Sequence, residues 1–189
     1  MKKTFTLYLF MLVLTIFGLS IPTTSKAIDA SMKKQNNSLD KMLTKSKKAK
    51  AAFIKNDADM NKLFKSAYGY VIFPNVGKGA MVVGAASGNG LVFENGHLIG
   101  KGKMIQVTVG VQAGGKAYSE VIFFENKAAL ERFTDNKLEF SGQASAVAVK
   151  SGASATAKYA NGVLVFTQDL GGLMVEASIG GQKFTYEKL

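Results

Sequence analysis

The distribution of glycine along the chain constrains its fold more than any other feature. Of the 20 glycines in the 189-residue sequence, 19 lie in residues 68–189, and residues 31–67 contain none. Glycine weakens a helix, whereas in a strand it permits bulges and close approach of other backbone. The sequence therefore predicts a helical N-terminal part and a β-rich part, with the border near residue 67.

The β-rich part predicts a mostly antiparallel sheet. Its apolar residues recur with a period of two, or in short runs bounded by glycine, as strands do. Asn95-Gly96 and Asn161-Gly162 are typical of hairpin turns, because a type I′ turn needs a positive φ at both central residues. The expected strands are residues 68–73, 79–85, 90–94, 104–111, 119–124, 144–149, 155–159, 163–167, 173–179 and 183–186.

One short helix is expected within the β-rich part, over residues 126–133, with Asn126 as its N-cap and Leu130 and Phe133 facing inward. The pattern as a whole shows no regular alternation of strand and helix. We therefore expect an α+β fold with a strongly twisted, glycine-rich β-sheet or barrel-like core, N-terminal amphipathic helices and this inserted helix.

The helical part has an apolar side and a basic side. Asn56-Asp57 is expected to cap a second short helix after the first. The apolar side can pack on the β-rich part or lie in the head-group region of a bilayer, and the pattern leaves both open. The apolar residues of the two helices are Leu39, Met42, Leu43, Ala49, Phe53 and Ile54, then Met60, Leu63, Phe64 and Ala67. The lysines opposite are Lys41, Lys45, Lys48 and Lys55.

The first 27 residues have the pattern of a secretory signal peptide. Lys2 and Lys3 precede an uncharged apolar stretch, and Ser25 and Ala27 are the small residues that a cleavage site requires. The apolar stretch, residues 5–21, is shorter than the roughly 20 residues of a spanning helix, which favours cleavage over an uncleaved membrane anchor. The sequence contains no cysteine, so an acylated lipoprotein is excluded.

The expected organisation is a signal peptide (1–27), a basic amphipathic helical arm (28–67) and a glycine-rich β core (68–189). The arm and the core are expected to form one domain. The expected location is periplasmic or secreted, in a bacterium, with peripheral association with a membrane.

Positive charge is concentrated in the helical arm. Removal of residues 1–27 leaves 21 basic and 13 acidic residues, a net charge of +8. Residues 28–65 account for +6 of this, with ten lysines against four aspartates. Such a basic region indicates an anionic partner. For an exported protein we expect phospholipid and not nucleic acid.

The sequence offers little for catalysis. His97 is the only histidine and follows a turn signal, so we expect it to be exposed. One histidine without cysteine cannot supply the usual zinc ligands, and no Gly-x-Ser-x-Gly motif is present. The acids Glu94, Glu120, Glu125 and Glu131 are scattered and expected to be solvated. We therefore expect no enzyme activity, no metal and no cofactor.

Three glycine-lysine segments could bind anions through backbone N–H groups. They are residues 77–79, 100–103 and 114–116, and they contain Lys78, Lys101 and Lys103 among their cations. None of them matches a nucleotide-binding loop. Tight turns with solvated lysines are one interpretation, and contacts with lipid head groups are the other.

Several ordered motifs resemble those of the SYLF domain family. The first is Tyr-Val-Ile-Phe-Pro-Asn-Val-Gly-Lys-Gly at residues 70–79, and the glycine-rich Val-Gly-Val-Gln-Ala-Gly-Gly at residues 109–115 is another. The resemblance covers roughly residues 39–189. The further matching segments are residues 82–84, 90–92, 123–130, 142–146 and 171–178.

The resemblance implies a non-catalytic domain that binds phospholipid through an N-terminal amphipathic helix and basic residues, and in some members also filamentous actin. On this sequence it points to Lys41, Lys45 and Lys48, with Lys78 as a further candidate. Export makes actin an unexpected partner. Two features depart from the family pattern: residues 85–87 are uncharged, and the chain has no tryptophan.

The main alternative is an envelope scaffold or a module that binds a protein partner without lipid specificity. A small outer-membrane barrel is disfavoured, because most expected strands are shorter than the roughly 9–11 residues that a membrane-spanning strand needs. The sequence does not predict the oligomeric state or the lipid head group.

Overall fold

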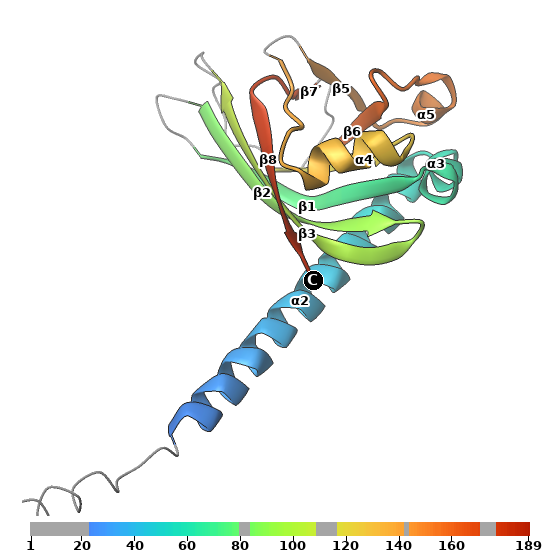
Figure 1. The fold of residues 1–189 in the computed structure, drawn as a ribbon. Coiled ribbons are helices and arrows are strands. Elements are labelled where there is room, and N and C mark those ends of the chain that lie inside the picture. Colours follow the sequence, from blue (N-terminus) through green and yellow to red (C-terminus); the bar gives the residue numbers. More distant parts are fainter. Residues whose placement is uncertain (1–22, 80–83, 109–116, 142–143, 171–176) are drawn as a thin grey trace, which may run out of the picture. The chain divides into compact units, whose positions relative to one another are not determined.

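The computed structural model describes residues 23–79, 84–108, 117–141, 144–170 and 177–189. The chain divides into two units, Met1–Asp40 and Lys41–Leu189. Helix α2 (Thr23–Asn56) begins in the first unit and ends in the second. In its described residues the second unit also contains a β-sheet and three further helices (Figure 1). These helices are α3 (Met60–Ser66), α4 (Lys127–Thr134) and α5 (Ala153–Thr156).

The strands form one sheet in the order β7-β5-β6-β4-β1-β2-β3-β8. All pairs are antiparallel except β5 with β6, which is parallel. The expected α+β class and mostly antiparallel sheet are confirmed, and in the described part of the chain the sheet is open and does not close into a barrel. The strands are β1 (Gly69–Gly79), β2 (Gly84–Glu94), β3 (His97–Thr108), β4 (Tyr118–Phe124), β5 (Ser145–Ala148), β6 (Val163–Asp169), β7 (Ala177–Ser178) and β8 (Gln182–Lys188).

The central strands are buried on both faces. On β1, Tyr70 and Ile72 point to one face of the sheet, and Val71 and Phe73 point to the other. All seven residues of β4 are buried. A strand covered on both faces shows a continuous apolar run in the sequence instead of alternation, which is the pattern of these segments.

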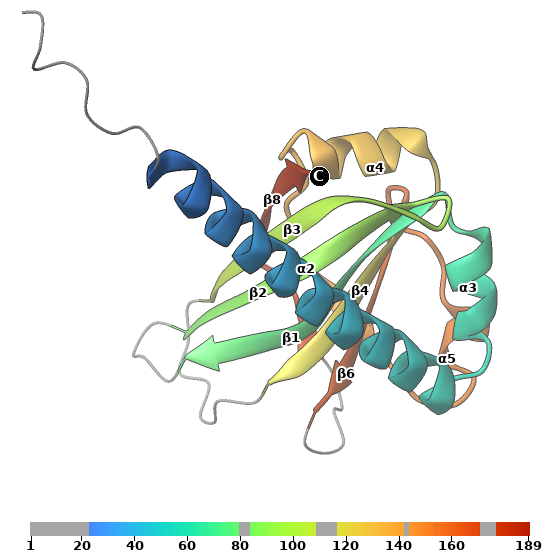
Figure 2. The same cartoon turned by 90° about the horizontal axis from the view of Figure 1, so that it is seen from below.

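One face of the sheet is covered by the C-terminal part of α2 and by α3 (Figure 2). Phe53 of α2 and Met60 of α3 are fully buried, and Phe64 lies edge-on to the rings of Tyr70 and Phe123, at 5.1 and 4.9 Å between centroids. The expected inward side of both helices is confirmed for these residues. Leu63 and Ala67 pack at the margin of the same cluster.

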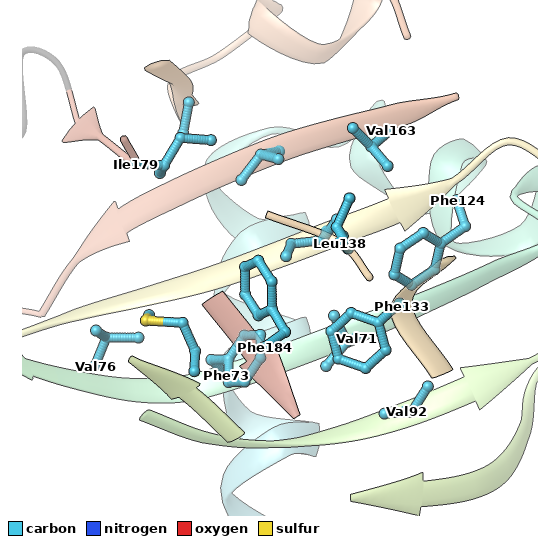
Figure 3. Close-up of a cluster of buried hydrophobic side chains, with 14 of the residues drawn as sticks. Val71, Phe73, Val76, Val92, Phe124, Phe133, Leu138, Val163, Ile179 and Phe184 are labelled. Carbon is cyan, nitrogen blue, oxygen red and sulfur yellow. The ribbon is translucent and has the colours of Figure 1, made fainter. Parts of the chain in front are cut away.

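The other face is covered by α4, and Figure 3 shows Phe133 of this helix among the buried side chains of that face. Asn126 caps this helix, since its side chain accepts a hydrogen bond of 3.0 Å from the backbone N–H of Ala129. Leu130 and Phe133 are buried against the sheet, and the ring centroids of Phe133 and of Phe184 on β8 lie 5.5 Å apart. The inserted helix and its cap are therefore confirmed.

The corner between α2 and α3 is fixed by a buried carboxylate. Asp57 is 2% exposed and accepts hydrogen bonds from the backbone N–H groups of Ser154 (2.7 Å) and Asp59 (3.2 Å). Burial by itself raises the pKa of Asp57, but these hydrogen bonds outweigh it and hold the pKa below its ordinary value. The expected Asn56-Asp57 cap is wrong, because Asn56 still belongs to α2, and Asp59 occupies the N-cap position of α3 without a side-chain hydrogen bond.

Both expected hairpin turns have the expected backbone. Asn95 and Gly96 have φ of 49° and 82°, and Asn161 and Gly162 have φ of 51° and 76°. The expected strand at residues 155–159 is wrong. Residues 153–156 form the short helix α5, which starts after Gly152 in the left-handed region. Much of the expected strand at 173–179 and the turn at 114–116 lie outside the described residues.

Candidate functional site

Four exposed lysines lie on one side of α2: Lys41, Lys45, Lys48 and Lys55. Their spacings of four, three and seven residues place them on one face of a helix. Among the residues that the structure describes, none of the four forms an ion pair. This basic side of α2 is the largest set of predicted site residues that the structure brings together.

The opposite side of the same segment is fixed to the domain. Ala49 and Phe53 are 7% and 0% exposed and belong to the cluster around Tyr70 and Phe166. Of the two possibilities that the sequence left open, the structure therefore shows core packing for residues 49 and 53. These side chains are not available to enter a bilayer while the domain is folded.

Lys50 occupies the boundary between the two sides. Its Nζ lies 4.6 Å from the ring centroid of Phe64 and 5.1 Å from that of Tyr70, and it donates a hydrogen bond of 3.4 Å to the Tyr70 hydroxyl. Burial lowers the pKa of Lys50, because desolvation disfavours the charged ammonium. A cavity of about 170 Å³ lies beside it, lined also by Leu43 and Phe93. Lys50 is thus half-buried against the rings of Phe64 and Tyr70, unlike the exposed lysines of the basic side.

Lys101 and Lys103 lie on a strand and not in a loop. The expected turn at residues 100–103 is wrong, because the whole segment belongs to β3. The glycines there serve packing. A Cβ at Gly100 would lie 2.2 Å from the Tyr186 ring, and one at Gly102 would lie 3.0 Å from the Phe133 ring.

These two lysines have different surroundings. The Lys101 side chain is 23% exposed, and its Nζ lies 3.7 Å from Oε1 of Glu187, whereas Lys103 is exposed. Both alternate with the buried Met104, so they lie on the face of the sheet that α2 covers (Figure 2). Lys78 pairs with Ala86 near the end of β1, and its side chain lies outside the described residues.

A buried polar cluster joins β3, β4 and β8 on the α4 side of the sheet. The Tyr118 hydroxyl donates to Oε1 of Gln106 at 3.2 Å. Nε2 of Gln182 donates to Oε2 of Glu120 at 2.9 Å and lies 3.4 Å from the Tyr118 hydroxyl. The Gln106 amide in turn donates to the carbonyl of Gly180 at 3.2 Å. The four side chains thus form a continuous network within the core.

Glu120 is the unusual member of this cluster. It is 0% exposed, so the expectation that it is solvated is wrong. Burial raises the pKa of Glu120 to about 7, although the hydrogen bond from Gln182 acts in the opposite direction. Burial and the neighbouring Glu120 also raise the pKa of Tyr118. The carboxyl can therefore exchange a proton near neutral pH.

The cluster also contains buried oxygens without a hydrogen-bond partner among the described residues: Oε1 of Glu120, Oγ1 of Thr167 and Oε1 of Gln182. Thr167 lies directly opposite Glu120 on the neighbouring strand β6. Sequence reasoning missed this cluster. Its one signal was the spacing of Tyr118, Glu120 and Ile122, which places a carboxyl on an inward-facing side of a buried strand.

Other kinds of site find no support in the part of the chain that the structure describes. No group of three or more His, Cys, Asp or Glu side chains there is arranged to hold a metal ion. His97 is exposed, as expected. None of the helices described is both long and apolar enough to cross a membrane.

Comparison with known proteins identifies the family. Residues 105–188 match the Ysc84 family model, described as "Las17-binding protein actin regulator". The chain is also 33% identical over 129 residues to Beta cell expansion factor A from Aeromonas veronii. The chain belongs to the Ysc84 (SYLF) family. This assignment confirms the resemblance seen in the sequence.

The SYLF family is linked to lipid or actin binding and is generally non-catalytic. The alignment with the Aeromonas relative covers 67% of this chain and 48% of that protein, so the chain spans about half the relative's length.

Proposed function

We propose that this SYLF protein is a non-catalytic phospholipid-binding protein that contacts anionic membrane surfaces through the basic side of α2. The observation that carries the proposal is the pairing of two features on one helix. Lys41, Lys45, Lys48 and Lys55 are exposed and form no ion pair with a described residue, while Phe53 anchors the helix to the sheet. A cationic surface is thereby held in a fixed orientation.

The proposed contact is electrostatic. A lysine near an anionic lipid surface contributes on the order of 1 kcal/mol, so four lysines suffice for a reversible association. Because Phe53 is buried, this part of α2 lies on the head groups and does not insert its apolar side. Lys103, which is exposed on β3, supplies additional positive charge.

Co-sedimentation of the purified protein with phosphatidylglycerol-containing vesicles tests the proposal. The triple variant Lys41→Glu, Lys45→Glu, Lys48→Glu reverses charge only at exposed positions, so we expect it to fold normally. Loss of three favourable contacts and their replacement by repulsion should weaken vesicle binding by at least tenfold.

A matched variant controls for net charge. Lys127→Glu, Lys137→Glu, Lys188→Glu makes the same charge change at exposed positions away from α2. We expect it to lose much less vesicle affinity than the α2 variant. Equal losses in the two variants would show that net charge, and not the basic side of α2, governs binding.

We further propose that the protein is exported, with residues 1–27 removed as a signal peptide. The charged start, the apolar stretch and the small residues at positions 25 and 27 support this. Export would place the protein beside envelope phospholipid and away from cytosolic actin. N-terminal sequencing of the protein recovered from the producing cells should give Ile28 as the first residue, and Met1 would contradict cleavage.

Protein-partner binding is the second candidate. Ile105 and Val107 on β3 are 45% and 53% exposed and point to the same side of the sheet. Exposed apolar side chains of this kind can contact another protein. A partner that co-purifies without lipid, and is lost when Ile105 and Val107 are both changed to Ser, would favour a scaffold role.

A further inference from the structure

A cavity of about 520 Å³ lies at the sheet edge formed by β5 and β6. It arises because β5 pairs with β6 only through Val147 and Ala148, which face Phe166 and Thr167. The start of β6, around Val163, has no β5 residue beside it in this pairing. The cavity is bounded there by the segment after α4, at residues 138–141. The volume falls within the roughly 300–1,000 Å³ of pockets that bind small organic ligands.

The inner wall of the cavity is apolar. Leu138, Val163, Val165 and Ile179 line it, and all four belong to the core on the α4 side of the sheet. Figure 3 shows Leu138, Val163 and Ile179 on the β6 side of this cluster. These side chains are at most 9% exposed, so only the small part of each that faces the cavity is open to a ligand.

The rim of the cavity is basic. Arg132 of α4, the only arginine of the chain, and Lys158 both line it. Arg132 donates a hydrogen bond from Nη2 to the carbonyl of Asn161, which holds the guanidinium at the rim. Among the described residues of the lining, the one acid is Glu139, and its carboxylate lies 3.6 Å from Nζ of Lys183. An anionic group is therefore the complementary ligand for this rim.

We propose that this cavity binds a single-chain anionic amphiphile. The hydrocarbon chain lies against Leu138, Val163 and Val165, and the anionic head group lies at Arg132 and Lys158. A water molecule's share of liquid volume is about 30 Å³, and a methylene group is of similar size, so one chain of roughly a dozen carbons fits and two long acyl chains do not. This site is separate from the basic side of α2 and adds a second mode of lipid contact to the proposed function.

Calorimetric titration without vesicles tests the proposal. The probes share a twelve-carbon chain, are used below their micelle concentrations and differ in head group: dodecanoate, dodecyl phosphate, neutral dodecyl maltoside and cationic dodecyltrimethylammonium. We expect both anions to bind, with the neutral probe at least tenfold weaker and the cation weaker still. Dodecanoate and dodecyl phosphate together show whether the rim prefers a carboxylate or a phosphate. Failure of both anions to bind would overturn the proposal.

Two variants assign the binding to the cavity. Arg132→Gln with Lys158→Gln removes the rim charges and should weaken dodecanoate binding about tenfold without changing dodecyl maltoside binding. Ser145→Phe, at an exposed position that lines the cavity, should block all the probes. Lys137→Gln, exposed and outside the cavity lining, is the control. Unchanged dodecanoate affinity in both cavity variants, with wild-type melting temperatures, would contradict the assignment.

The test separates this site from the α2 surface. The triple variant Lys41→Glu, Lys45→Glu, Lys48→Glu should bind dodecanoate as the wild type does, even where its vesicle binding is lost. A parallel loss of dodecanoate binding in that variant would show that the α2 lysines hold the amphiphile, and would overturn the cavity site.

Discussion

At the scale of single residues, Glu120 is the most informative side chain in the structure. A carboxylate without a paired cation is costly inside a protein, and among the described residues Glu120 has a single hydrogen bond, from Gln182, and no cation beside it at full burial. The cost falls when the group is protonated. Glu120 therefore links the stability of the β core to pH.

The substitution Glu120→Gln should stabilise the protein above neutral pH and remove part of its pH dependence. Glu120 has an ordinary pKa of 4.5 and a folded-state pKa of about 7. Between these values the folded state binds the proton more tightly, so the free energy of unfolding decreases as pH rises, by roughly 3 kcal/mol in total. Above about pH 7 both states are ionised and the loss is complete. Urea unfolding from pH 4 to 8 measures this, and we expect a flatter profile for the variant.

Glu125→Gln is the matched control, since Glu125 is an exposed acid five residues further along the chain. Its profile should follow that of the wild type. Parallel profiles for Glu120→Gln and the wild type would mean that the Glu120 carboxyl does not titrate in this range.

The sequence could have indicated that Glu120 faces inward, because it shares its strand face with Ile122 and Phe124. The sequence could not indicate which side chain would donate a hydrogen bond to Glu120. Gln182 lies 62 residues away, and the hydrogen bond depends on the position of β8 in the sheet. The glycines of β3 show the same limit. Gly100 is spaced for a turn in the sequence, but its role is set by the ring of Tyr186, which a Cβ would meet at 2.2 Å.

At the scale of elements, α2 shows what a hydrophobic pattern can and cannot predict. The spacing of Ala49 and Phe53 relative to Lys45 and Lys48 predicted the helix and its two sides, and the structure confirms both. The apolar side of α2 could pack equally well on a protein core or on a bilayer surface. Only the aromatic cluster around Tyr70 and Phe123, assembled from distant strands, shows that the core is its partner.

The substitution Phe53→Ala should destabilise the protein by about 3–5 kcal/mol, because it opens a cavity in a fully buried cluster. Lys45→Ala, an exposed change eight residues earlier on the same helix, should change stability by less than about 0.5 kcal/mol. Denaturant unfolding without lipid measures both. A small effect of Phe53→Ala would mean that α2 is released from the sheet in solution, and would restore insertion as a mode of membrane contact.

Residues 155–159, which overlap the short helix α5, were predicted as a strand from their apolar period of two. The structure shows that a tertiary contact, and not the local pattern, accompanies the helical conformation of this segment. The backbone N–H of Ser154, within α5, binds the buried Asp57 carboxylate at the α2–α3 corner, and this contact spans 97 residues. A local pattern carries no information about such a contact.

At the scale of the whole molecule, the sequence predicted the class of fold but not its order of strands. Apolar runs and Asn-Gly turns were sufficient for an antiparallel sheet with helices at its N-terminal side and one helix inserted. The parallel pairing of β5 with β6, and the return of β8 to the side of β3, are long-range choices that leave no local signal. The partial β5 pairing is also what leaves room for the proposed amphiphile cavity.

The basic side of α2 and the apolar cavity beside β6 are separate sites on the domain. We therefore expect the two proposed modes of lipid contact to respond differently to salt. The basic side of α2 is exposed, and the screening length falls from about 10 Å at 0.1 M salt to about 3 Å at 1 M. Vesicle binding should therefore increase with the anionic lipid fraction and decrease at least tenfold between 0.1 and 1 M salt. Dodecanoate binding should decrease much less, because salt does not screen the burial of its hydrocarbon chain. Co-sedimentation and calorimetry across one salt series measure both. Vesicle binding that is insensitive to salt and equal on neutral lipid would remove the electrostatic basis for the α2 contact while leaving the cavity untouched.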